Sequence, residues 1–152
     1  MNNPSPSLSV LIASYNTREM TLACLRSISA EAGSDDFEVI VVDNGSADGS
    51  AAAVEAECPA VKLIRSTENL GFARANNLAA LRAAGSFILL LNSDTLVRDL
   101  AIDRLVAFAN ANPQAGIWGG RTVFADGSLN PKSCWRFMSL WSLFAQAVGL
   151  DA

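Results

Sequence analysis

The stretch LSVLIASYN, residues 8–16, is a nearly unbroken apolar run over 8–13 followed by Ser14, Tyr15 and Asn16. Such a run predicts a strand buried on both faces, as in parallel sheets that are covered by helices on each side. After Thr17 the apolar residues recur at helical spacing, at Met20, Leu22, Cys24, Leu25 and Ile28. A strand followed by a helix is the repeating unit of α/β proteins.

The same alternation recurs three times along the chain. We expect strands over 37–42, 61–64 and 87–91, followed by helices over 50–57, 72–84 and 100–110. Four strand–helix units in succession predict an α/β fold with a mostly parallel, doubly wound sheet. Residues 116–124 are expected to form a further strand, with a hairpin turn at Asp126-Gly127 that returns the chain through Ser128 and Leu129.

The composition suggests one α/β domain over 8–131, after a flexible leader over 1–7 and before an apolar segment over 132–152. In that last segment Trp135 to Leu150 carries aromatic and aliphatic residues and a single charge, Arg136. We expect a helix that docks on the sheet or on further sequence. A membrane-interface or acceptor-side element is the open alternative, because aromatic residues mixed with leucine suit the headgroup boundary.

Charge and composition exclude several classes of function. The chain has 152 residues, of which 51% are hydrophobic, and its formal net charge of −4 gives no electrostatic attraction to nucleic acid. It contains no histidine, which excludes Ser-His-Asp catalysis and histidine-ligated zinc. The glycine-rich signatures of dinucleotide-binding folds and of P-loop NTPases are also missing.

The cysteines and the N-terminus indicate the compartment. Cys24, Cys58 and Cys134 are odd in number and far apart, so neither a disulfide scaffold nor a thiolate metal site is expected. Residues 1–9 have no basic region followed by a long apolar run, so they do not resemble a signal peptide. We expect a cytoplasmic protein, with peripheral contact to the inner face of the membrane left open.

Polar residues collect after the predicted strands, at the edge where open α/β sheets bind ligands. Asp94 and Asn92 follow the fourth strand, and their oxygens suit Mg²⁺ or Mn²⁺ when substrate phosphates complete the shell. The alternative role of Asp94 is to cap the next helix. Asp43 and Asn44 follow the second strand, where they can contact a nucleobase or ribose or can simply form a turn.

A third group lies at the start of the third helix, where NLGFARANN occupies residues 69–77. A glycine at the helix start and Arg74 in its first turns favour an anion such as pyrophosphate. An exposed arginine on a solvated helix face is the alternative. Asn76 and Asn77 are poor helix formers, so a polar role for them is plausible.

Four motifs together resemble family 2 glycosyltransferases with a GT-A type fold: SVLIASYN at 9–16, VIVVDNGSADGS at 39–50, NLGFARANN at 69–77 and LLLNSDT at 89–95. The N-x-D form of the last motif and the G-F-A of the third are most similar to the rhamnosyltransferase-like branch. The resemblance implies that 8–131 is the donor-binding part and that the acceptor side is truncated. It implies these nucleotide-sugar-binding residues: Ala13, Ser14, Tyr15, Asn16, Asp43, Asn44, Arg74, Asn77, Asn92 and Ser93. It implies that Asp94 holds a divalent metal, Mg²⁺ or Mn²⁺.

The implied activity is a metal-dependent, inverting transfer by a hexosyltransferase-type enzyme. The donor would be a dTDP- or UDP-linked sugar such as rhamnose, and the acceptor a glycan or lipid-linked hydroxyl of cell wall or polysaccharide synthesis. The resemblance places the family's catalytic base, a carboxylate, beyond the hairpin. Asp151 is the only acidic side chain after Asp126 and does not lie in the family's acidic motif, so we expect this chain to lack the base. A non-catalytic nucleotide-sugar-binding fragment and a receiver-like signalling domain are the alternatives.

Overall fold

A computed structural model describes residues 5–33 and 36–133 of the chain. The chain divides into two compact units, Met1–Asn112 and Pro113–Ala152. The elements are β1 (Leu8–Ser14), α1 (Arg18–Glu31), β2 (Phe37–Asp43), α2 (Ser50–Glu57), β3 (Lys62–Arg65), α3 (Gly71–Ala80), β4 (Phe87–Leu90), α4 (Ala101–Ala111) and the short 3₁₀ helix η1 (Pro131–Ser133). The predicted four strand–helix units are therefore confirmed.

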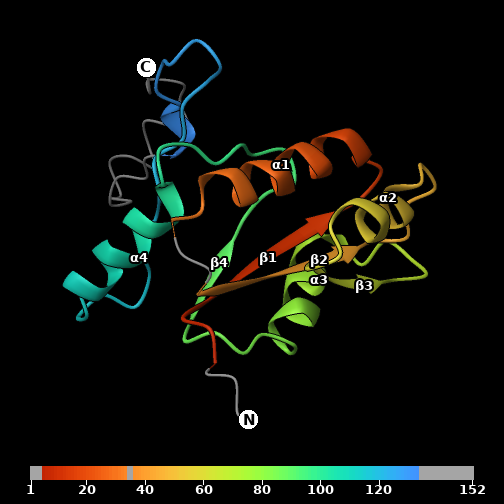
Figure 1. Cartoon of the computed structure of the whole chain (residues 1–152), viewed down its shortest axis with the longest axis horizontal. Helices are drawn as coiled ribbons and strands as arrows, with labels where there is room; N and C mark the ends of the chain where they lie inside the picture. The colour runs from red at the N-terminus through yellow and green to blue at the C-terminus, as the bar shows by residue number, and fades with distance from the viewer. Residues whose placement is uncertain (1–4, 34–35, 134–152) are drawn as a thin grey trace, which may run out of the picture. The chain divides into compact units, whose positions relative to one another are not determined.

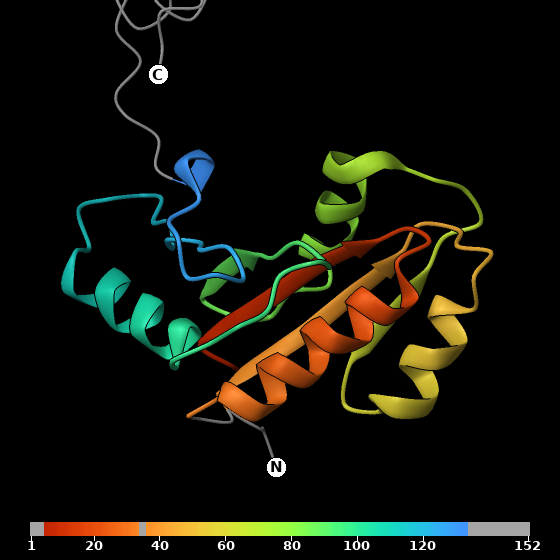
Figure 2. The same cartoon turned by 90° about the horizontal axis from the view of Figure 1, so that it is seen from above.

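The first unit is built on a parallel sheet with the strand order β3-β2-β1-β4. Leu8 in β1 pairs with Phe37 of β2 on one side and with Phe87 of β4 on the other. The chain moves outward from β1 to β3 and then crosses back, through α3, to place β4 beside β1. As Figures 1 and 2 show, α1 and α2 lie on one face of the sheet and α3 lies on the opposite face.

Each face of the sheet has its own core, because successive strand residues point to opposite sides. Val10 and Ile12 of β1 pack with Leu22 and Leu25 of α1. This larger core also includes residues of α2 and α4. Leu11 faces the other way and belongs to a smaller core with Ile40, Val42, Ala75 and Ala79. The alanines of α3 allow a close approach of that helix to β1 and β2.

Two sequence predictions need correction. The helix expected over 72–84 ends at Ala80, because the backbone N–H of Ala84 donates to Glu38 Oε1 at 2.6 Å and is drawn down to the sheet. The strand expected over 116–124 is wrong: within the described part of the second unit, pairing is limited to an antiparallel bridge between Val123 and Leu129. Ile117 is 91% exposed, so no neighbouring strand supports a ladder there. The Asp126-Gly127 turn is confirmed, since Phe124 N–H donates to Ser128 O at 2.8 Å.

A polar cluster closes the α3 face at the amino ends of the strands. Glu38 Oε1 accepts from Ser9 Oγ at 2.6 Å, while its Oε2 accepts from Lys62 Nζ at 2.5 Å. Ser9 Oγ in turn accepts from Gly85 N–H at 2.9 Å. The connection between α3 and β4 is thus held to β1 and β2 by a partly buried hydrogen-bond network, in which the loss of one partner leaves another polar group unsatisfied.

Replacing Glu38 with glutamine should destabilise the fold and alter its pH dependence. Burial works against ionisation of Glu38, but bonds from Lys62, Ser9 and Ala84 outweigh it and lower the pKa of this carboxyl below 4.5. Because the folded-state pKa is the lower one, this stabilisation is present above about pH 4.5 and is lost as pH falls through the folded-state pKa. The variant should lose about 1.5–3 kcal/mol at pH 7, the usual contribution of hydrogen bonds to a charged group.

Urea unfolding of Glu38→Gln at pH 7 and pH 4 measures both effects. Glu55→Gln is the matched control, because Glu55 forms an exposed ion pair with Arg65 that should contribute less than about 1 kcal/mol. Equal unfolding midpoints for the two variants at pH 7 would contradict the proposal that the hydrogen bonds of Glu38 stabilise the fold.

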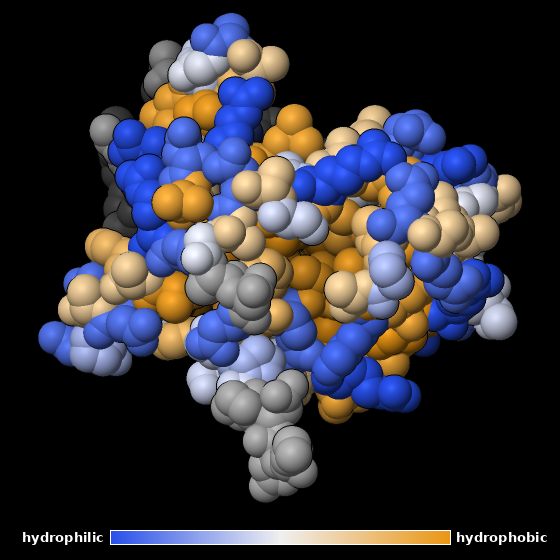
Figure 3. All heavy atoms as spheres, viewed as in Figure 1, coloured by the Kyte–Doolittle hydropathy of each residue, from blue (hydrophilic) through white to orange (hydrophobic). Residues whose placement is uncertain are grey.

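The face drawn in Figure 3 carries hydrophobic residues between hydrophilic ones. Ile88 and Leu90 of β4 are among the large apolar residues exposed to solvent. None of the helices within residues 5–33 and 36–133 is both long enough and apolar enough to cross a membrane.

Candidate functional site

The carboxyl ends of β1, β2 and β4 meet at one edge of the sheet, where their following loops form the candidate site. The order of the strands reverses between β1 and β4, since the chain leaves β1 toward β2 and later returns on the opposite side. Open α/β sheets bind ligands in the crevice that such a reversal creates at the carboxyl edge. The residues that follow β1, β2 and β4 are therefore the ones to consider first.

The loops after β1 and β2 are tied together. Asn44 N–H donates to Ser14 O at 2.8 Å, and Ala47 N–H donates to Asn16 Oδ1 at 2.9 Å. Asn16 has φ 51°, a left-handed conformation that asparagine tolerates, and its own N–H donates to Ser46 Oγ at 2.9 Å. The side-chain oxygen of Asn16 thus serves the loop itself, which leaves its Nδ2 group for a ligand.

Asp43 and Asn44 lie at the centre of this loop pair, and each is only 4% exposed. Asp43 Oδ2 accepts from Ser46 N–H at 3.2 Å. The other carboxylate oxygen, Oδ1, and the amide oxygen of Asn44 are buried without a hydrogen-bond partner among the described residues. A buried acceptor without a partner lowers the stability of the fold by about 1–3 kcal/mol. Two such oxygens on consecutive residues therefore suggest a binding site for a ligand that donates hydrogen bonds.

The loop after β4 carries Asn92, Ser93 and Asp94, and it turns tightly, with Thr95 N–H donating to Asn92 O at 3.1 Å. The Cys24 thiol of α1 also donates to the Asn92 carbonyl oxygen, at 3.8 Å. Burial, and then the charge of Asp94, raise the pKa of the Cys24 thiol to about 12, so it stays protonated and remains a donor.

The Asp94 carboxylate is exposed and forms no ion pair with any residue in the described ranges. Among those residues no group of three or more cysteine, aspartate or glutamate side chains could enclose a metal ion. A single carboxylate with a neighbouring amide fits Mg²⁺ or Mn²⁺ only where a ligand's phosphates supply further oxygens. The oxygens of Asp94 and Asn92 therefore fit a metal site that the protein would share with a phosphate-bearing ligand.

A model of the family described as glycosyl transferase family 2 matches residues 9–149. The chain belongs to this family. The GT-A type fold implied by the sequence motifs is also confirmed, because the solved structures that match are glycosyltransferases of that fold. The receiver-like alternative is thereby set aside.

The curated relatives include the uncharacterized glycosyltransferase YfnE of Bacillus subtilis (strain 168), 36% identical over 106 residues, which cover 67% of this chain and 27% of YfnE. An N-acetylglucosaminyltransferase of Bradyrhizobium elkanii is 30% identical over 126 residues, which cover 80% of this chain and 69% of that protein. The succinoglycan biosynthesis protein ExoO of Rhizobium meliloti (strain 1021) is 34% identical over 116 residues. The chain spans 27% and 33% of the lengths of YfnE and ExoO.

Two solved structures are similar over about the same region. The mannosyltransferase PcManGT from Pyrobaculum calidifontis, in complex with GDP-Man and Mn²⁺, aligns with a TM-score of 0.63 at 29% identity, covering 70% of this chain and 33% of that one. S. aureus TarS 1–349 in complex with UDP aligns with a TM-score of 0.63 at 27% identity, covering 69% and 32%.

The chain brings some of the residues predicted for the site together and leaves others apart. The loops holding Ser14 to Asn16, Asp43 to Asn44 and Asn92 to Asp94 lie at the same sheet edge, and Tyr15 is half exposed there. Ala13 is partly buried against the smaller core. Arg74 is 71% exposed, 4.0 Å from Glu68, and Asn77 is exposed on α3. No hydrogen bond or ion pair among the described residues joins Arg74 or Asn77 to Asp43 or Asp94.

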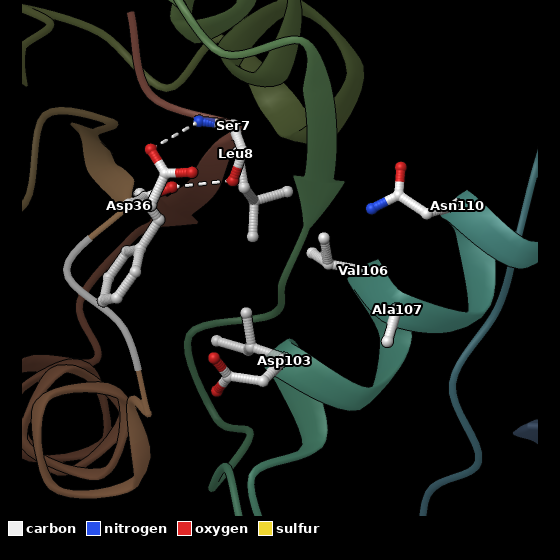
Figure 4. A pocket seen from close by; sticks show the side chains of 9 residues that line it. Ser7, Leu8, Asp36, Asp103, Val106, Ala107 and Asn110 are labelled. Atoms are coloured by element: carbon white, nitrogen blue, oxygen red, sulfur yellow. Dashed lines mark hydrogen bonds between the residues drawn. The ribbon is translucent and has the colours of Figure 1, made fainter. Parts of the chain in front are cut away.

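A hollow of about 230 Å³ lies at the opposite edge of the sheet, near Ser7, Leu8 and α4 (Figure 4). Its two carboxylates already serve the backbone: Asp36 accepts from Ser7 N–H at 3.1 Å and Asp103 from Gly33 N–H at 3.1 Å. Neither residue has a buried oxygen without a partner among the described residues, in contrast to Asp43 and Asn44 at the carboxyl edge.

Proposed function

We propose that the chain forms the donor site of a glycosyltransferase that moves a sugar from a nucleoside diphosphate to a hydroxyl of a glycan or lipid-linked acceptor. The observation that carries this proposal is the pair of buried, unpartnered oxygens, Asp43 Oδ1 and Asn44 Oδ1. Both accept hydrogen bonds, and a nucleoside offers donors in the imino group of its base and in its ribose hydroxyls. The half-exposed ring of Tyr15 nearby is suited to pack against a base.

In this proposal Asp94 and Asn92 hold the diphosphate end of the donor through a divalent cation. The cation, when bound, would neutralise the negative charge that develops on the leaving diphosphate. Support comes from the exposed Asp94 carboxylate and from PcManGT, which was solved with GDP-Man and Mn²⁺. We further propose an inverting reaction and a rhamnose-type sugar, on the motif resemblance alone.

Calorimetric titration of the purified chain with UDP, dTDP and GDP, each with and without Mn²⁺, tests the proposal. We expect one nucleotide to bind, and to bind more tightly when Mn²⁺ is present. A folded protein that binds none of the three under either condition would refute the donor site.

Asp43→Asn should weaken nucleotide binding without unfolding the protein. The substitution removes the buried charge and puts an amide where the unpartnered oxygen accepts, so a ligand donor would lose a charge-assisted bond worth about 1.5–3 kcal/mol, or roughly 10- to 150-fold in affinity. The loss should be the same with and without Mn²⁺. The free energy of unfolding of the ligand-free protein should not fall, because no filled hydrogen bond of the Oδ1 atom is removed.

Asp48→Asn is the contrasting control in the same loop. Asp48 Oδ1 accepts from Ser50 N–H at 3.0 Å and its Oδ2 accepts from Arg18 N–H at 3.0 Å, so both oxygens already have partners. This variant should lower the melting temperature and leave nucleotide affinity intact. The opposite pattern for the two variants would show that Asp43 is a structural residue and Asp48 a ligand contact.

A further inference from the structure

One face of α1 carries a row of small polar side chains directed at the loop after β4. The row consists of Thr17, Thr21, Cys24 and Ser27, spaced three or four residues apart as one helical face requires. Ser27 Oγ accepts from Val97 N–H at 2.9 Å, and the Cys24 thiol donates to Asn92 O. The loop that holds Asp94 therefore rests on α1 through hydrogen bonds at several points.

Thr17 makes the contact nearest to Asp94. Its Oγ1 lies 3.3 Å from Ser93 Oγ, 3.1 Å from Ser14 Oγ and 3.1 Å from Thr21 Oγ1. A hydroxyl can donate one hydrogen bond and accept two, so these three partners use the whole capacity of the group. Ser14 and Thr21 are each 1% exposed, which holds the hub of the cluster in a fixed place.

The hydroxyl of Thr17 contacts these side chains and does not cap the helix. Thr17 is the N-cap residue of α1, a position where a threonine side chain commonly accepts from a backbone N–H of the first turn, yet here no such side-chain bond is formed. The helix start therefore does not depend on this hydroxyl. What depends on it is the link between β1, α1 and Ser93.

We propose that Thr17 is a positioning residue for the cation held by Asp94, acting through Ser93; the inference rests on the proposed function. Asp94 has no ion-pair partner within the described ranges to fix its carboxylate. Its backbone is fixed by the neighbouring residue, whose hydroxyl is joined to the Thr17 hub. Groups that orient a ligand residue commonly change metal affinity by about 10- to 100-fold when removed.

Thr17→Val is the direct test, because valine keeps the shape of threonine and removes the hydroxyl. We expect nucleotide affinity measured by calorimetry with Mn²⁺ to fall about tenfold. Affinity measured without Mn²⁺ should stay at the wild-type value, because Asp43 and Asn44 belong to a different loop. Thr17→Ser, which restores the hydroxyl, should recover the wild-type response to Mn²⁺.

Two further variants separate positioning from stability. Thr21→Val removes a hydroxyl of the same cluster whose partners are Ser14 and Thr17 rather than Ser93, so it should lower the unfolding midpoint and reduce the Mn²⁺ response less than Thr17→Val does. Ser93→Ala should match Thr17→Val, and the double variant should add little, as expected for two partners in one interaction.

The outcomes are distinguishable. A wild-type chain without nucleotide binding would refute the proposed function itself. A wild-type chain with a Mn²⁺ response that Thr17→Val retains in full would overturn the inference and leave the proposed function standing. Equal losses with and without Mn²⁺ would also overturn it, because they would show a general structural effect.

Discussion

Replacing Gly85 with alanine should lower the free energy of unfolding by about 3 kcal/mol or more, since overpacking and the loss of hydrogen bonds to Ser9 and Glu38 act together. A Cβ atom at Gly85 would lie 2.5 Å from the backbone carbon of Leu8 and 2.5 Å from the backbone nitrogen of Ser9. Neither atom belongs to a flexible side chain, so the α3–β4 connection would have to lift away from β1. This movement of the connection would lengthen the hydrogen bond from Gly85 N–H to Ser9 Oγ and the hydrogen bond from Ala84 N–H to Glu38.

Thermal unfolding followed by circular dichroism measures the effect, and a fall in melting temperature of roughly 10 °C is expected. Gly116→Ala is the control, because a Cβ there meets nothing within 4 Å. That variant should be neutral or slightly stabilising, as alanine reduces the conformational freedom of the unfolded chain. Wild-type stability in Gly85→Ala would mean that the connection does not approach β1 as closely as the structure has it.

Asp94→Asn should abolish the gain in nucleotide affinity that Mn²⁺ provides. The amide keeps the size of the side chain and removes the charge, which leaves only neutral amides at positions 92 and 94 for a hard cation. A loss of at least about tenfold is expected, the lower end of what even indirect partners of a metal contribute. Affinity without Mn²⁺ should be unchanged, which separates this variant from Asp43→Asn.

Asp99→Asn is the matched control for Asp94→Asn. Asp99 carries the same charge in the same loop and has φ 53°, a conformation that asparagine accepts, so the exchange introduces no backbone strain. Calorimetry with UDP, dTDP and GDP at constant ionic strength should show a normal Mn²⁺ response for Asp99→Asn. If both variants lose the response equally, the effect is one of net charge rather than of a ligand at Asp94.

Much of the fold could be predicted from the sequence, because apolar residues that recur with a fixed period report directly on burial. The helix predicted over 50–57 has the same bounds in the structure, and β1 extends only one residue beyond the predicted strand. The C-terminal end of α3 could not be predicted, since the chain after it is bound by Glu38, which lies far away in the sequence. Met20 belongs to the apolar residues at helical spacing that predict α1, but it is exposed in the first turn, whereas Thr21 is buried.

The candidate site was predictable in part for a related reason. Polar residues directly after apolar strands reach the carboxyl edge whatever the details of packing, which is why Asp43, Asn44, Asn92 and Asp94 could be named. The Thr17 contacts could not be found this way, because a threonine before a helix is expected to cap it. Only the side-chain geometry shows that the hydroxyl turns toward Ser93.

The place of β1 between β2 and β4 has a consequence for how the protein is made. β1 leaves the ribosome first, but its partner strands start at Phe37 and Phe87, so its second edge is covered only after most of the first unit has been synthesised. Until then an apolar strand with open hydrogen-bonding groups is free to pair with other chains. Translation speed and chaperone supply should therefore affect the soluble yield, because both change how long this edge stays open.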